Sequence, residues 1–166
     1  MSEPFPQQPQ QPPTGPVPGS LLERFVARLL DGLIVGIPTA IVLGIIFGIL
    51  GIAGETIGTI LISAIIGVAQ LGYMVYFEST TGQTIGKKVM NLRVVNAQSA
   101  VPTQEEAIKR NIWLALSLFA GIPVLGVLTG LGSLAAVIAI AVTINSNPFG
   151  RGWHDNFADT AVVKSA

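Results

Sequence analysis

The sequence predicts an all-α integral membrane protein, a small bundle of three to four transmembrane helices behind a disordered proline-rich N-terminal tail. Half of the 166 residues are hydrophobic and only 11% are charged, whereas soluble domains carry about 25% charged residues. Residues 32–54 also form a long run without any charged side chain. As a helix with a rise of ~1.5 Å per residue, this run would cross a hydrocarbon core of about 30 Å.

The N-terminal tail, residues 1–20, differs in composition from the rest of the chain. It contains seven prolines and four glutamines but no lysine or arginine. Such a segment cannot bury enough apolar surface to fold, so we expect disorder or polyproline structure there and a membrane domain over residues 21–166. The tail is either a solubilising segment or a ligand for a proline-recognising partner.

The first two membrane helices are predicted over residues 21–50 and 56–77. Pro38 lies inside the first helix, which neighbouring helices in a membrane can tolerate. A polar stretch over residues 78–106 follows. Within it, residues 89–96 are long enough for one short strand but too short for a sheet.

The third apolar region, residues 112–144, is longer than one span needs and shorter than two full spans need. Gly121 and Pro123 interrupt it, and proline disfavours a continuous helix. We therefore expect helices over residues 104–120 and 123–144 that go in and come back. A single span, with the C-terminus outside, is the alternative.

Basic residues predict the orientation in the cell (inner) membrane. They cluster in residues 87–110, whereas residues 51–55 hold none. The positive-inside rule therefore places the N-terminus and the central loop in the cytoplasm. Arg151 and Lys164 suggest a cytoplasmic C-terminus as well.

The inventory of reactive side chains is small. Nine basic and nine acidic residues cancel, which argues against nucleic-acid binding, and the chain has no cysteine and one histidine, His154. We expect no enzyme activity, no cofactor and no metal site. Residues 82–88 superficially resemble a phosphate-binding loop, but three residues rather than four separate Gly82 and Gly86, and no Ser or Thr follows Lys87. We therefore reject nucleotide binding.

Small residues recur at four-residue steps along the first helix, namely Gly32, Gly36, Ala40, Gly44 and Gly48. Small residues let membrane helices approach closely. We favour packing of this stripe against the second helix over its use as a homodimer face.

Charges at the start of the first helix form the candidate site. Arg24 and Asp31 lie on the same helix face, about 10.5 Å apart along the axis, and Arg28 is close enough to pair with Asp31. Two interpretations are open: an interfacial cluster with snorkelling arginines, or a buried ionic network that reaches Asp155, with Arg28 and His154 in support.

These residues also carry a resemblance to a known family. Residues 23–34 resemble the opening of the RDD family of small bacterial membrane proteins, residues 82–95 its second block, and residues 152–160 its closing block. The resemblance covers residues 21–164, places the family arginine on Arg24 and the two aspartates on Asp31 and Asp155, and extends to the proline-rich tail of actinobacterial members. It implies a three- or four-helix inner-membrane domain, with transport suggested and cation/proton antiport proposed for some members. Asp159 stands where the resemblance leads us to expect glycine.

Two functions follow from these observations. The first is a small-solute or cation/proton transporter or transporter subunit that acts through Asp31 and Asp155, because ionisable residues in membrane segments are functional candidates. The alternative is a non-transporting accessory or scaffold protein that packs against other membrane proteins through its glycine stripe and tail. The expected partners are the lipid bilayer, a second copy or other membrane proteins, and a cation or small solute.

Overall fold

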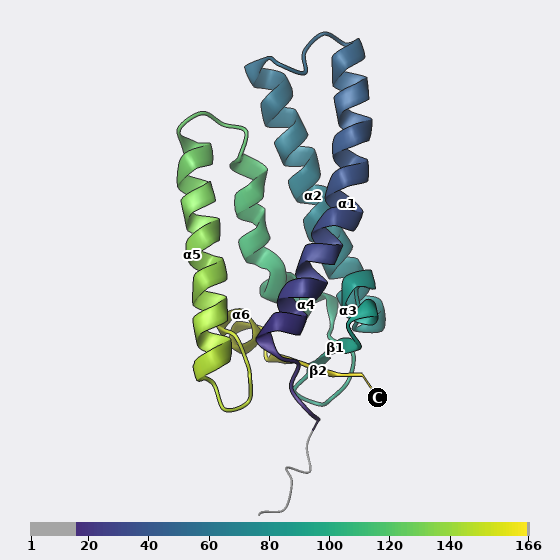
Figure 1. Cartoon of the computed structure of the whole chain (residues 1–166), viewed down its shortest axis with the longest axis vertical. Helices are drawn as coiled ribbons and strands as arrows, with labels where there is room; N and C mark the ends of the chain where they lie inside the picture. Colours follow the sequence, from purple (N-terminus) through teal and green to yellow (C-terminus); the bar gives the residue numbers. More distant parts are fainter. Residues whose placement is uncertain (1–15, 166) are drawn as a thin grey trace, which may run out of the picture.

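Long apolar helices extend from one polar end of the molecule, which is built from short helices and two short strands (Figure 1). The computed structural model describes residues 16–165, so most of the predicted tail lies outside the described residues. The elements in chain order are α1 (Leu21–Ile49), α2 (Thr56–Thr81), α3 (Ile85–Val89), β1 (Leu92–Asn96), α4 (Gln104–Asn111), the 3₁₀ helix η1 (Ile112–Phe119), α5 (Leu125–Ser146), α6 (Trp153–Phe157) and β2 (Thr160–Lys164).

Three helices, α1, α2 and α5, are long and apolar enough to cross a membrane, by length and composition. The helix predicted over residues 104–120 is divided into polar α4 and apolar η1. Even with the larger rise per residue of a 3₁₀ helix, η1 is too short to cross a hydrocarbon core. The chain therefore makes one long hairpin, α1 and α2, and one shorter hairpin, η1 and α5 (Figure 1). Proline does not end α1, whose helix continues through Pro38.

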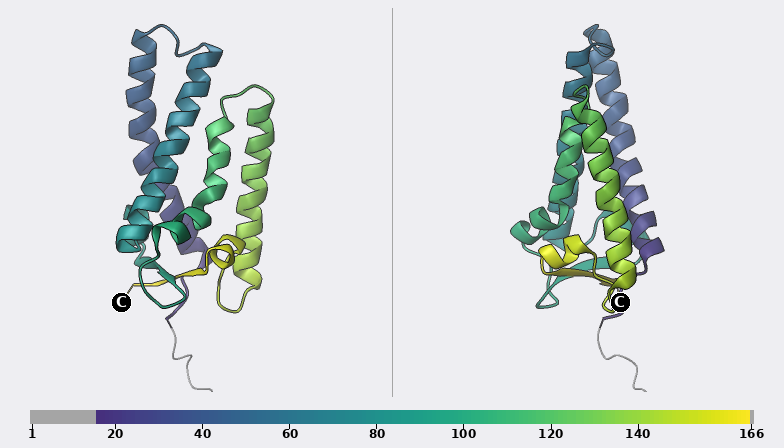
Figure 2. Two further views of the ribbon diagram at one scale, coloured as in Figure 1. Left: turned by 180° about the vertical axis from the view of Figure 1, so that it is seen from behind. Right: turned by 90° about the vertical axis from the view of Figure 1, so that its left-hand side faces the viewer.

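The two halves of the chain meet in a two-stranded antiparallel sheet, in which Leu92 pairs with Lys164 and Asn96 with Thr160. The predicted strand therefore does belong to a sheet, because its partner comes from the C-terminal end of the chain. Figure 2 shows this sheet lying across the polar end of the helices. Beneath it lies a small core of Ala27, Leu92, Val94 and Val162.

The last residues of the predicted tail belong to the folded part. The backbone N–H of Gly19 donates to Val162 at 3.0 Å, and that of Lys164 donates to Val17 at 2.8 Å. Ser20 then caps α1, because its hydroxyl accepts from the N–H of Glu23 while the Glu23 carboxylate accepts from Ser20. The boundary predicted at residue 20 is therefore a few residues too late.

Asp159 enters β2 with a φ of 49°. This is the left-handed region, where glycine is favoured and Asp and Asn are tolerated better than most residues. The departure from the expected glycine thus falls on a position whose backbone conformation explains the expectation.

Only the first part of the glycine stripe of α1 lies near α2, where the side-chain amide of Gln70 donates to the carbonyl oxygen of Gly32 at 3.3 Å. A methyl group added at Gly32, Gly44 or Gly48 would meet nothing within 4 Å, and one at Gly36 would meet only the side-chain nitrogen of Gln70, at 3.8 Å. The buried residues in this part of α1 are the large ones, Leu43 and Phe47. The rest of the stripe, Ala40, Gly44 and Gly48, is exposed.

Close approach occurs at other glycines. A methyl group at Gly67 of α2 would lie 2.9 Å from the side chains of Ser117 and Leu118 in η1. At the tip of the second hairpin, Gly121 donates its backbone N–H to the Ser63 hydroxyl at 2.9 Å. These contacts hold the short hairpin against α2 and satisfy a turn amide at membrane depth.

The fold predicts that the turn between β1 and α4 and the C-terminus share one side of the membrane. Single cysteines at exposed Ala97 and at Ser165 should show the same accessibility to an impermeant thiol reagent in intact cells, because both lie at the polar end. A cysteine at exposed Ala53, in the turn between α1 and α2, should show the opposite accessibility. The chain has no native cysteine to interfere. Different labelling of Ala97→Cys and Ser165→Cys would contradict the two-hairpin arrangement.

Candidate functional site

Asp155 is the centre of a buried ion-pair network at the polar end. Its carboxylate is fully buried in α6. One oxygen, Oδ2, accepts from Nη1 of Arg24 at 2.9 Å and from the backbone N–H of Gly152 at 3.0 Å. The other oxygen accepts from Nη1 of Arg110. Both oxygens are therefore occupied by donors from three separate segments.

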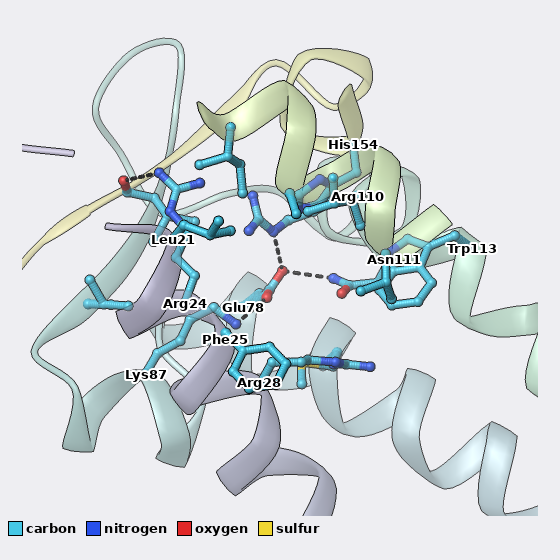
Figure 3. Close-up of a pocket in the computed structure, with 17 residues that line it drawn as sticks. Leu21, Arg24, Phe25, Arg28, Glu78, Lys87, Arg110, Asn111, Trp113 and His154 are labelled. Atoms are coloured by element: carbon cyan, nitrogen blue, oxygen red, sulfur yellow. Dashed lines mark hydrogen bonds and ion pairs between the residues drawn. The ribbon is translucent and has the colours of Figure 1, made fainter. Parts of the chain in front are cut away.

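Glu78, near the end of α2, is the second centre and is 1% exposed. It accepts from Nζ of Lys87 at 2.8 Å and from Nδ2 of Asn111 at 2.8 Å. Nε of Arg110 lies 3.2 Å from its Oε2. Arg110 thus connects the two carboxylates, and Figure 3 shows Glu78 between its donors.

The network ties α1, α2, α3, α4 and α6 together through side chains. Burying such charges costs several kcal/mol per ion, and only well-formed partners offset that cost. Here each carboxylate has two cations and a further hydrogen-bond donor. Removing one member would therefore leave the others buried without compensation.

The charges set the protonation of the groups that lie outside the membrane spans. Burial opposes the charge on Arg110, but Asp155 and Glu78 outweigh it and raise the pKa of Arg110. Burial likewise opposes the charge on Asp155, but Arg110 and Arg24 hold the pKa of Asp155 below its ordinary value of 3.8. Burial lowers the pKa of His154 to about 4, against the attraction of Asp155. His154 is therefore neutral at pH 7, and its 3.5 Å contact with Asp155 is not an ion pair.

Asp31 does not join this network, contrary to the interpretation that placed it there. It is fully buried and accepts from the Thr84 hydroxyl at 2.6 Å, from the Tyr73 hydroxyl at 2.8 Å and from the backbone N–H of Gly86 at 2.7 Å. No ion pair of Asp31 occurs within residues 16–165. Asp31 therefore attaches α3 to α1 through neutral donors.

The contact between α3 and α1 requires glycine at position 86 for a steric reason. A methyl group at Gly86 would collide with the backbone carbonyl of Ala27 and would lie 2.9 Å from Cγ of Asp31. The segment that resembles a phosphate-binding loop is thus a docking element. Thr84 caps α3 and Gly86 lets it approach α1.

Arg28 was expected to pair with Asp31 but points elsewhere. Its guanidinium carbon lies 5.5 Å from the centre of the Trp113 ring, a cation–π geometry. Within residues 16–165 it has no ion-pair partner and donates no hydrogen bond. Arg28 is thus a cation of α1 whose hydrogen-bonding groups are unused.

A cavity of about 140 Å³ lies beside the network. The 17 residues around it come from the polar ends of the long helices and from the short elements (Figure 3). Arg24, Arg28, Lys87 and Arg110 supply four cations to its lining, and Glu78 supplies the lining carboxylate. The remaining walls are mainly apolar side chains of α1 and α5, so the cavity has a charged floor and apolar sides.

Arg24, Asp155 and His154 were anticipated from the sequence, but four members of the site were missed, which are Glu78, Lys87, Arg110 and Asn111. The sequence did contain a signal for Glu78 and Arg110. Glu78 follows the apolar run of α2, and Arg110 shortly precedes that of η1. Charges at the ends of membrane segments are expected to meet at one bilayer surface, which would have brought Glu78 and Arg110 together.

Comparison with known proteins supports the resemblance. A sequence model of the RDD family matches residues 18–159, most of the chain. Neither the curated proteins nor the solved structures include a significant match. The matched range includes Arg24, Asp31 and Asp155. Residues 16–165 contain no group of three or more His, Cys, Asp or Glu residues that could hold a metal ion.

The network predicts strong coupling between Arg24 and Asp155. Asp155→Asn should lower the free energy of unfolding by about 3–5 kcal/mol, because two buried arginines lose their carboxylate. Asp159→Asn, at an exposed side chain, is the control and should change it little. Adding Arg24→Gln to Asp155→Asn should cost less than the sum of the single changes. A double-mutant cycle on unfolding in detergent measures this coupling.

The same cycle on Arg24 and Asp31 should give no coupling. Arg24→Gln and Asp31→Asn should each destabilise the protein, but their effects should add, because the two residues share no partner. Recovery in this double variant would contradict the separation of Asp31 from the network.

His154 predicts a pH dependence of stability. The unfolded chain binds a proton at His154 near pH 6.5, but the folded protein does so only near pH 4. Stability contributed by neutral His154 is thus complete above pH 6.5 and is lost as the pH falls toward 4, by at most about 3 kcal/mol. The unfolding temperature of His154→Gln should therefore change less with pH between 6.5 and 4 than that of the wild type. Equal slopes would contradict the burial of a neutral histidine.

Proposed function

The chain belongs to the RDD family, and we propose that it is a multi-pass cell-membrane protein that binds and moves an anionic small solute, as a small transporter or a subunit of one. The cavity beside the ion-pair network is the proposed site. It is not proposed as an enzyme. The observation that supports this function most directly is the charge of the cavity.

That charge is positive. Among residues 16–165, four cations line the cavity, Arg24, Arg28, Lys87 and Arg110, and Glu78 is the one carboxylate of the lining. Two further carboxylates lie behind the lining, Asp155 on Arg24 and Arg110 and Asp31 near Arg28, so positive charge remains in excess. His154 is neutral at pH 7 and adds no charge. A concave site with surplus positive charge and apolar walls attracts anions and strengthens their binding.

The carboxylates argue against the cation/proton form of the transport hypothesis. A cation on Asp31 or Asp155 would have to displace donors at 2.6–3.0 Å from oxygens that already accept from hydroxyls, backbone amides or arginines. Displacing them would leave those donors buried and unpaired, at a cost of about 1–3 kcal/mol each and more for arginine. The small-solute form of the hypothesis needs no such displacement.

We propose that the polar end and both termini are cytoplasmic. Lysine and arginine gather in the connections at this end, whereas the two connections at the opposite end, residues 50–55 and 120–124, contain none. This asymmetry is the one that the positive-inside rule associates with the cytoplasm. The cavity would then open near the inner bilayer surface.

A second candidate function, a non-transporting accessory protein, is supported by the glycine face of α1. Space around Gly32, Gly44 and Gly48 would allow a second helix to approach closely. That helix could belong to a second copy of the chain or to another membrane protein.

Proteoliposomes on a solid-supported membrane distinguish these functions. With the wild type, a jump in the concentration of phosphate, acetate or octanoate at constant sodium concentration should give a current. Ala141→Phe, which fills the cavity from α5, should abolish that current. The size-matched variant Ala139→Phe, at an exposed position of α5, is the control. Currents driven by sodium or potassium at constant anion would instead favour cation exchange. Absence of any current would favour the accessory function.

A further inference from the structure

We propose that the cavity binds the phosphate headgroup of an anionic phospholipid that enters sideways from the bilayer between α1 and α5, with Arg28 as its anchor. This inference rests on the proposed function in that it uses the same cavity and narrows the ligand to a phosphate-bearing amphiphile. It does not require that the ligand be transported.

Arg28 differs from the other three cations of the lining. Arg24 and Arg110 bind Asp155, and Lys87 binds Glu78. The guanidinium of Arg28 has no acceptor within residues 16–165 and lies over the Trp113 ring. Figure 3 shows it directed away from the Glu78 cluster. None of its guanidinium nitrogens is fully enclosed by protein, so an acceptor from outside the protein can reach them.

The geometry at Arg28 favours phosphate. Stacking on Trp113 fixes the plane of the guanidinium while its N–H edges remain unused. A planar fork with free N–H groups suits a bidentate oxyanion such as phosphate. An arginine that only snorkels to the bilayer surface would not need this aromatic support.

The walls indicate an amphiphile rather than a free ion. The lining of the cavity also includes Phe25 of α1 and Val137 of α5, which are 58% and 41% exposed. Ile140 and Ala141 continue this apolar wall on α5. A cavity of about 140 Å³ holds a headgroup and not a whole lipid, so the acyl chains would remain outside, along the exposed apolar faces of α1 and α5.

The height of the cavity in the bilayer agrees with this ligand. Arg28 lies two turns into α1, and the opposite wall comes from the last turns of α5, at the polar end of both helices. Phospholipid headgroups occupy this level of a membrane. The site therefore lies where a lipid phosphate is available at high local concentration.

Equilibrium lipid binding tests the proposal. Purified protein in detergent would be titrated with phosphatidylglycerol and with phosphatidylcholine, and bound lipid counted by native mass spectrometry. We expect Arg28→Gln to weaken phosphatidylglycerol binding about tenfold or more, the loss expected for one charge-assisted contact. The matched control Lys88→Gln removes the same charge from an exposed position at the same end of the protein and should change binding less than twofold.

A second pair of variants distinguishes lipid binding in the cavity from non-specific attraction by positive charge. This pair also keeps the proposal testable if Arg28→Gln does not fold. Ala141→Phe leaves every charge in place and should abolish phosphatidylglycerol binding, whereas Ala139→Phe should not. Equal losses in Arg28→Gln and Lys88→Gln, or retention of the lipid by Ala141→Phe, would overturn the site. Displacement of phosphatidylglycerol by stoichiometric inorganic phosphate would overturn the lipid assignment in favour of a free solute.

The outcome is independent of the transport experiment. Specific phospholipid binding without any anion current would uphold the lipid site and remove the transport proposal. Anion currents without specific phospholipid binding would do the reverse.

Discussion

The double salt bridge of Asp155 to Arg24 and Arg110 is the interaction on which the rest of the structure depends. In a bilayer, apolar helix faces gain little from meeting one another, because lipid tails are equally apolar. The mutual positions of α1, α4 and α6 are instead set where buried charges find partners. Arg110 extends the constraint to Glu78 of α2, so that one guanidinium holds the long hairpin and the short hairpin together.

The arginines serve two purposes at once. Arg24 and Arg110 neutralise carboxylates on one side and line the cavity on the other. The ion-pair network therefore fixes the positions of the charged side chains that line one side of the cavity. Of the four cations that line the cavity, Arg28 is the one without an ion pair to a carboxylate among residues 16–165, and this distinguishes a structural cation from one available to a ligand.

Much of the fold could be predicted from the sequence, because lipid imposes length and hydropathy on α1, α2 and α5. The break near Pro123 was equally visible. The sheet was not, since neither strand alone indicates a partner so distant in the chain. In the site, resemblance to the family placed Arg24 and Asp155, whereas the helix spacing that allows Arg28 to pair with Asp31 is not used for an ion pair. Spacing gives the face of a helix and says nothing of the rival donors Thr84 and Gly86, which bind Asp31 from another element.

The position of Asp155 after its three network partners in the sequence has a consequence for biogenesis. Arg24, Glu78 and Arg110 leave the ribosome well before the carboxylate that completes their network. Until α6 is made, Arg24 lacks its carboxylate partner and Arg110 has only Glu78. The polar end can therefore close only after α6 has been made. A chain that stops short of α6 would keep its membrane helices and expose an open basic surface, a form that quality-control proteases could distinguish from the complete protein.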